Sequence, residues 1–218
     1  MRYYMADPHF FHEGLNTKMD CRGFGSAEEM NEYILMKWNA KVRSKDDVVI
    51  LGDLSFGKAE ETNALLRRLQ GRLYLILGNH DKLIKNKDFD AGRFEWIKPY
   101  EEWNDHKRKV ILCHYPILCY NGQYRLDGNG KPKVYMLHGH IHNTYDQRLV
   151  DQFQEITRNS VIEQASGERR GIPSNIINCF CMYSDYTPLT LDEWIICDQN
   201  RRKEGVIWQR IFHRERCR

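Results

Sequence analysis

Short apolar runs recur along the chain, and most of them end in Gly, Asp, Asn or His. These runs, four to seven residues long, lie at residues 2–6, 47–51, 73–77, 109–113, 134–137 and 176–182. Their short, nearly continuous apolar character predicts strands that are buried on both faces. The aromatic-rich, alternating stretch 94–103 predicts a further strand, interrupted at Pro99 because proline cannot donate to a sheet ladder.

Between these runs, the apolar residues repeat at helical spacing. Helices are expected at residues 26–41, 59–70, 148–157 and 190–200. Ser26 with Glu29, and Thr190 with Glu193, have the spacing of capping boxes, which open helices. Strands that alternate with helices predict an α/β fold with a parallel sheet. No internal repeat or low-complexity linker divides the chain, so we expect one domain over residues 1–218.

The charge of the chain is uneven. The net charge is +3 over 218 residues, but residues 201–218 hold seven Lys or Arg against two Glu. Residues 1–200 therefore carry about −2, and only the C-terminal tail is basic. A solvated helix face and a contact with nucleic acid or another polyanion are the two interpretations of this tail.

Cysteine usage and hydropathy bear on the compartment. No apolar run approaches the length of a membrane span, and the N-terminal residues lack the apolar stretch of a signal peptide. The seven cysteines are an odd number, and Cys179 and Cys181 lie in an apolar stretch that predicts burial rather than zinc binding. We expect a reduced, cytoplasmic protein without a membrane partner.

Residues of metal-ligand type stand where the predicted strands end: Asp7, His9, Asp53, Asn79, His80, His114, His138, His140 and His142. Carboxyl ends of parallel strands share one edge of a sheet, where ligand sites form. Mixed carboxylate, imidazole and amide donors suit Mn, Fe, Co or Zn better than Ca or Mg. One carboxylate between two cations can hold them about 3.5–4 Å apart, the spacing of two-metal hydrolases.

Two local patterns refine this expectation. Asp7 and His9, two residues apart around Pro8, should point to the same side of an extended chain. Three imidazoles lie within residues 138–142, and we expect at least two of them to bind metal and one to be spare. The glycine-rich loop 121–130 is expected either to overhang the site or to be an ordinary exposed hairpin.

Five motifs, in order, resemble those of the calcineurin-like metallophosphoesterase superfamily, and in particular its small bacterial members. They are Asp7-x-His9, Gly52-Asp53, Gly78-Asn79-His80-Asp81, His114 and Gly139-His140-x-His142. The resemblance extends from Asp7 to about Trp194. It implies a four-layer sandwich, in which two packed mixed β-sheets are flanked by helices.

The resemblance also implies roles for these residues. One metal would be bound by Asp7, His9 and His142, a second by Asn79, His114 and His140, with Asp53 bridging the two. His80 would assist the leaving group while a metal-bound hydroxide attacks the phosphorus, and Asp81 would orient His80. His138 would be the spare imidazole near the metals. Tyr124 and Arg125, in the loop 121–130, are candidate substrate contacts.

The resemblance therefore implies a two-metal phosphoesterase, more specifically a phosphodiesterase. A phosphomonoesterase, a nuclease and a non-catalytic metal-binding scaffold are the alternatives, and nucleotides or nucleic acids are among the candidate substrates. Leu54 to Gly57 lack the Asp-Arg-Gly of the superfamily's protein phosphatases, which argues against a phosphoprotein substrate. Residues 145–175 look longer than in small members and suggest an insertion that serves as a lid, a dimer contact or a partner surface.

Overall fold

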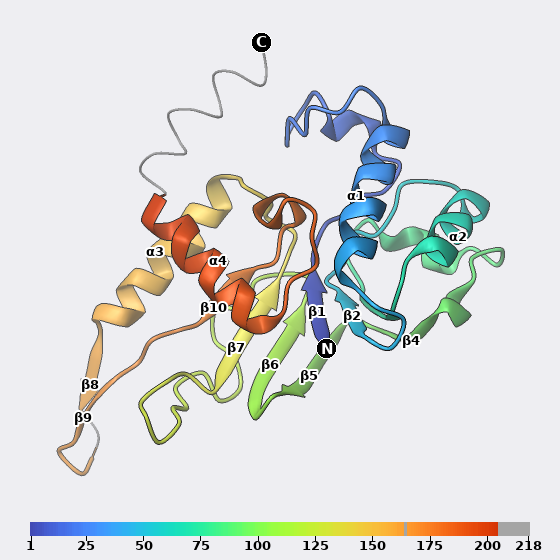
Figure 1. Cartoon of the computed structure of the whole chain (residues 1–218). Coiled ribbons are helices and arrows are strands. Elements are labelled where there is room, and N and C mark those ends of the chain that lie inside the picture. The colour runs from blue at the N-terminus through green and yellow to red at the C-terminus, as the bar shows by residue number, and fades with distance from the viewer. Residues whose placement is uncertain (164, 205–218) are drawn as a thin grey trace.

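The computed structural model describes residues 1–163 and 165–204, and within them two four-stranded sheets form the centre of the molecule (Figure 1). The first sheet is parallel, in the order β1 (Arg2–Met5), β2 (Asp47–Ile50), β3 (Arg72–Ile76) and β4 (Phe94–Lys98). The second has the order β10 (Ile176–Asn178), β7 (Val134–His138), β6 (Arg108–Cys113) and β5 (Tyr100–Asp105). Only β5 runs antiparallel to its neighbour in this sheet.

Four α-helices accompany the sheets in the described part of the chain: α1 (Ala27–Lys41), α2 (Ala59–Arg68), α3 (Tyr145–Asn159) and α4 (Leu191–Glu204). Short 3-10 helices are η1 (Glu13–Leu15), η2 (Asp81–Lys85), η3 (Ala91–Arg93) and η4 (Cys181–Ser184). Both expected N-caps are present. The Ser26 side chain accepts a hydrogen bond from the Glu29 backbone, and Thr190 and Glu193 bond reciprocally.

Strand alternation divides the interior into layers. Tyr3 and Met5 of β1 pack with residues of α1 and α2 on the outer face of the first sheet. Tyr4 and Ala6 point the other way and pack against the second sheet, whose far face is covered by α3. The layers are thus helix, sheet, sheet and helix, and the expected α/β sandwich is confirmed.

The chain passes from one sheet to the other at Pro99. Strand β4 ends at Lys98 on the edge of the first sheet, and β5 begins at Tyr100 on the edge of the second. Proline has no backbone N–H to donate, so a position between two edge strands suits it. The predicted interruption of the strand at Pro99 is confirmed.

Two segments differ from the prediction. The strand expected over residues 176–182 ends at Asn178, because the Asn178 side chain accepts a hydrogen bond from the backbone of Phe180 and turns the chain. Cys179 and Cys181 are buried as expected, but they lie beyond β10. The loop expected after the third predicted helix contains a hairpin of β8 (Val161–Glu163) and β9 (Arg169–Gly171).

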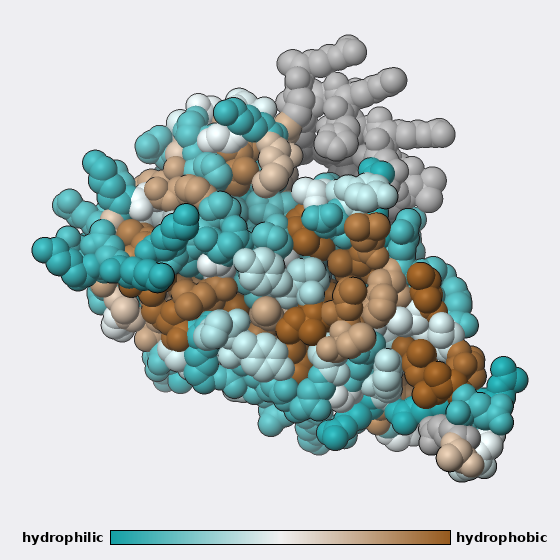
Figure 2. Space-filling model, turned by 180° about the vertical axis from the view of Figure 1, so that it is seen from behind, coloured by the Kyte–Doolittle hydropathy of each residue, from teal (hydrophilic) through white to brown (hydrophobic). Residues whose placement is uncertain are grey.

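On the face shown in Figure 2, apolar side chains form separate patches between polar ones. None of the helices described here is both long and apolar enough to cross a membrane. Of the predicted basic tail, Arg201 and Arg202 belong to α4, where Arg201 pairs with Asp151 and both pair with Asp198, so two carboxylates offset these two charges. The remainder of that tail, residues 205–218, lies outside the described residues.

Candidate metal centre

Residues that follow the carboxyl ends of strands in both sheets meet in one buried cluster. Two overlapping groups are Asp7 with His9 and His142, and Asp7 with Asp53 and His114. Within each group, the ligand-type atoms all lie within 4.8 Å of one another. Oδ2 of Asp53 lies 3.6 Å from Nε2 of His9 and 3.5 Å from Nε2 of His114. Asp53 therefore stands between the two histidines, as a bridging ligand must.

In two histidines, the hydrogen bond of the ring nitrogen that points away from the cluster determines the tautomer. Nδ1 of His142 lies 2.7 Å from a carboxylate oxygen of Asp20, and Nδ1 of His114 lies 2.8 Å from the carbonyl oxygen of Leu51. Both partners are acceptors, so each Nδ1 carries the proton and each Nε2 presents a lone pair to the cluster. These rings are thus oriented as metal ligands.

The lone pair of His114 faces another acceptor. Its Nε2 lies 2.9 Å from Oδ1 of Asn79, with Oδ2 of Asp53 at 3.5 Å. Acceptor atoms this close repel one another unless a proton or a cation lies between them. The mixture of imidazole, carboxylate and amide donors therefore fits divalent cations.

His140 completes the group of expected ligands at the end of β7. Its ring centroid lies 5.1 Å from that of His114, and its backbone N–H donates to both carboxylate oxygens of Asp7 at 3.1 Å. The ring is half-buried, whereas those of His114 and His142 are almost fully enclosed. His140 thus lies at the solvent side of the cluster.

Five of the expected ligands adopt left-handed backbone conformations. The φ angles are 55° at Asp7, 50° at His9, 53° at Asp53, 70° at His140 and 45° at His142. Non-glycine residues rarely adopt this conformation, and it costs on the order of 1–3 kcal/mol each. The expectation that Asp7 and His9 lie in an extended chain is therefore wrong. The left-handed turns, rather than strand alternation, bring these side chains to one site.

Three motif glycines leave space for the ligands. A Cβ atom would lie 2.3 Å from Nδ1 of His114 if added at Gly52, and 2.3 Å from Oδ1 of Asp53 if added at Gly78. At Gly139 it would lie 2.5 Å from Oδ2 of Asp7. Each glycine is thus required because a ligand side chain packs directly against its backbone.

The carboxylate of Asp81 holds the turn that carries Asp53. It accepts hydrogen bonds from the backbone N–H groups of Asp53 at 2.9 Å, Leu54 at 2.7 Å and Gly78 at 2.7 Å. Burial raises the pKa of Asp81, and these hydrogen bonds oppose the increase. Within residues 1–163 and 165–204, no hydrogen bond joins Asp81 to His80, so Asp81 does not orient that ring as expected.

His80, from the third motif, is exposed and lies at the mouth of the cluster. Its ring centroid is 5.9 Å from that of His9 and 5.0 Å from that of Phe56. Its backbone N–H donates to Oδ1 of Asp53 at 2.9 Å. The imidazole is therefore tied to the metal cluster through its backbone, while the ring stays open to solvent.

Sequence reasoning missed two charged residues beside the cluster, Asp20 and Arg22. Arg22 is 4% exposed, pairs with Asp20 at 3.0 Å, and donates to the backbone carbonyl groups of Asp7 and Pro8. Burial opposes ionisation of Asp20, but its hydrogen bond with His142 and the charge of Arg22 lower its pKa. No motif marks these two residues, because their role depends on a loop folding back over β1.

Burial also shifts the pKa values of the expected ligands in the metal-free cluster. Burial raises the pKa of Asp7 to about 6, although His142 and His114 partly offset it. Burial and the nearby Arg22 lower the pKa of His9. A neutral His9 is the form that binds a metal, and a cation in the cluster would keep Asp7 ionised.

Three further residues lie away from the open site. His138 is fully buried, with Nδ1 2.8 Å from the carbonyl oxygen of Gly139, so it lies beneath the cluster and does not face a substrate. Arg125 accepts a backbone hydrogen bond from Lys133, which precedes β7, whereas the metal cluster lies beyond the other end of β7. Tyr124 adjoins Arg125. The structure therefore does not bring Tyr124 or Arg125 to the metal cluster.

Comparison with known proteins agrees with this geometry. Residues 3–194 match the family model described as calcineurin-like phosphoesterase. Uncharacterized protein MJ1445 of Methanocaldococcus jannaschii is 36% identical over 142 residues, which cover 64% of this chain and 68% of that protein. Gene 66 protein of Mycobacterium phage L5 is 28% identical over 167 residues, covering 65% of this chain and 77% of that protein.

The solved structures include a similar fold. The protein of unknown function AQ665 from Aquifex aeolicus superposes with a TM-score of 0.57 at 20% sequence identity, covering 95% of this chain and 99% of that chain. At this level of identity, the likeness extends to the fold alone.

Proposed function

Because the chain belongs to the calcineurin-like phosphoesterase family, we propose that it hydrolyses a phosphodiester with the help of two divalent metal ions. The convergence of acceptor atoms around His114 carries the proposal. The lone pair on its Nε2 faces oxygen atoms of Asn79 and Asp53, and a cation between these atoms would satisfy all three.

The donor atoms divide between two ions. Asp7, His9 and His142 would hold one ion, Asn79, His114 and His140 would hold the other, and Asp53 would contribute to both. The buried group of Asp7, His9 and His142, and the position of Asp53 between His9 and His114, support this division. When bound, a pair of Mn, Fe, Zn or Co ions neutralises phosphate oxygens and supplies a water of lowered pKa.

His80 acts on the leaving group. Its ring is exposed at the mouth of the cluster, within reach of an ester oxygen of a phosphate placed over the metal ligands. As an acid it gives its proton to the departing oxygen, which would otherwise leave as an alkoxide. Asp81 contributes indirectly, because its carboxylate holds the backbone of Asp53 in place.

The charges around the cluster favour a diester over a monoester. A monoester dianion needs a further cation, often an arginine, to balance its extra negative charge. Arg22 is buried and already engaged by Asp20 and two carbonyl groups, and Arg125 lies at the far end of β7. Lys82, which follows Asp81, is exposed on a flexible stem. A monoanionic diester matches this charge better.

Metal content and turnover test the proposal together. The full chain, supplied with Mn, should hold close to two equivalents of metal by elemental analysis and hydrolyse bis(4-nitrophenyl) phosphate. Asp53→Asn, purified in the same way, is the matched control. Metal binding without turnover above that control would identify a binding scaffold and not an enzyme.

A further inference from the structure

A cavity lies far from the metal cluster, beside the loop that precedes β7. It has a volume of about 450 Å³, and its lining includes Tyr120, Gln123, Tyr124, Arg125 and Arg170. Arg170 belongs to β9, so the hairpin of the predicted insertion forms one wall. A hydrogen bond from its guanidinium to the carbonyl oxygen of Tyr124 joins the hairpin to the loop.

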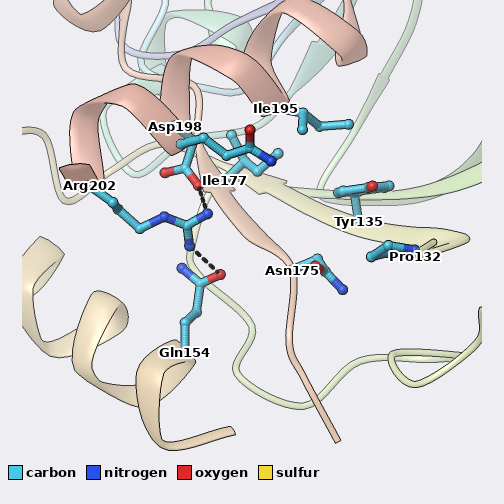
Figure 3. Close-up of a pocket in the computed structure, with 9 residues that line it drawn as sticks. Pro132, Tyr135, Gln154, Asn175, Ile177, Ile195, Asp198 and Arg202 are labelled. Carbon is cyan, nitrogen blue, oxygen red and sulfur yellow. Dashed lines mark hydrogen bonds and ion pairs between the residues drawn. The ribbon is translucent and has the colours of Figure 1, made fainter. Parts of the chain in front are cut away.

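The two guanidinium groups of this cavity are not neutralised. Across residues 1–163 and 165–204, neither Arg125 nor Arg170 forms an ion pair with a carboxylate. A smaller cavity of about 110 Å³ between α3 and α4 provides a contrast (Figure 3). There, Arg202 pairs with Asp198 at 2.7 Å and donates to Gln154, so its charge is already compensated within the protein. The larger cavity keeps two positive charges free for a ligand.

Gln123 adds a buried hydrogen-bond donor. Its side chain is 5% exposed, and Oε1 accepts a hydrogen bond from the backbone N–H of Tyr120 at 3.3 Å. This contact fixes the orientation of the amide, so that the remaining group is the donor Nε2. Nε2 of Gln123 has no partner in the described structure. A buried donor without a partner costs about 1–3 kcal/mol, which a ligand acceptor would recover.

Aromatic surface completes the lining. Tyr124 is 37% exposed, and Tyr120 lies beside it with its hydroxyl oxygen accepting a hydrogen bond from the backbone of Asn175. A flat tyrosine ring offers a stacking face to a heterocyclic base. A volume of 450 Å³ is in the range of small-molecule sites, which is roughly 300–1,000 Å³.

We propose that this cavity is a mononucleotide-binding site, separate from the metal centre. Arg125, Arg170 and Nε2 of Gln123 bind the phosphate, and Tyr124 stacks on the base. The donors are all N–H groups, which suits a phosphate with three acceptor oxygens. The hairpin of residues 161–171 then has a function, since it supplies Arg170.

The rate at which Cys119 is alkylated measures ligand binding in this cavity. Cys119 is an exposed thiol that lines the same cavity, so a bound ligand should shield it. The metal-loaded full chain is treated with iodoacetamide, and labelling at Cys119 is followed by peptide mass spectrometry with AMP, adenosine or inorganic phosphate present. AMP at about 1 mM should slow the labelling about tenfold, which corresponds to a Kd of about 0.1 mM. Chromatography confirms that AMP stays intact.

Two variants make the test specific. Arg125→Gln/Arg170→Gln should lose the protection by AMP while keeping wild-type hydrolysis of bis(4-nitrophenyl) phosphate, because neither residue is near the metal cluster. Arg169→Gln is the matched control, since Arg169 is exposed on the same strand and does not line the cavity. Absent protection, equal protection by adenosine, or full protection in the double variant would each overturn the proposal.

Discussion

The carboxylate of Asp20 lies 2.7 Å from Nδ1 of His142, although 122 positions separate the two residues in the chain. The contact fixes the imidazole tautomer that turns Nε2 toward Asp7 and His9. Carboxylates of this kind raise the basicity of metal-ligating histidines and hold their orientation.

Asp20→Asn should weaken metal binding without unfolding the protein. The amide can accept the hydrogen bond but carries no charge, so we expect about a 10- to 100-fold loss of metal affinity. Competition with a fluorescent chelator measures the affinity, and circular dichroism confirms the fold. Asp88→Asn, an exposed aspartate, is the control. Unchanged affinity in Asp20→Asn would show that the contact with His142 serves only the loop.

Asp53→Asn should lower the occupancy of both metal positions at once. A single neutral oxygen cannot neutralise two cations, so the loss is expected at both sites and not at one. Elemental analysis of the purified variant gives the answer. Two full equivalents of retained metal would remove Asp53 from its bridging position.

His80→Ala should have the opposite pattern. The ring is exposed and is proposed to act on the leaving group, so the variant should keep its metal and lose about 10²- to 10⁴-fold in kcat. His106→Ala, which removes another exposed imidazole, is the control and should retain wild-type kcat. Loss of metal from His80→Ala would place His80 among the ligands, and near-normal turnover would remove it from catalysis.

Gly139→Ala should destabilise the chain and displace Asp7. The added Cβ atom would lie 2.6 Å from that of Ala6 as well as 2.5 Å from Oδ2 of Asp7, and overpacking of this kind costs about 1–3 kcal/mol. Gly128→Ala is the matched control, because no atom lies within 4 Å of the added group. Urea denaturation compares the free energies of unfolding, and equal values for the two variants would contradict the close packing at Gly139.

An aryl phosphodiester should be hydrolysed with a higher kcat/KM than the matching monoester when Mn is supplied. The reason is the absence of an uncommitted arginine at the cluster in the described part of the chain. Both substrates are assayed side by side on one preparation, at about pH 7 to 8, where the monoester is mostly a dianion. A clear preference for the monoester would refute the diester assignment while leaving the metal centre intact.

The sequence predicted the strands and the polar residues at their ends, because burial on both faces leaves a clear apolar signature. It also predicted the interruption at Pro99, where the structure shows the chain crossing from one sheet to the other. It could not predict the left-handed turns at Asp7 and His142, since propensity disfavours them and the surrounding contacts impose them. The contact of Asp20 with His142 could not be predicted for a related reason, because a contact across 122 positions leaves no local pattern in the sequence.

The sequence left two interpretations open for the loop 121–130. Because the loop lies between two motif strands, it could overhang the site, with Tyr124 and Arg125 as substrate contacts, or form an exposed hairpin. The chain must, however, return to the start of a parallel strand after β6, and that return carries Arg125 to the opposite end of the sheet. The direction of a crossover decides which end of a sheet a loop visits.

The division of the cluster between the two sheets has a consequence for biosynthesis. A ribosome delivers Asp7, His9 and Asp53 well before His140 and His142. A nascent chain therefore offers an incomplete set of donors, which binds any ion weakly. The finished cluster can form only when the second sheet docks on the first, so metal acquisition is deferred until translation has passed β7.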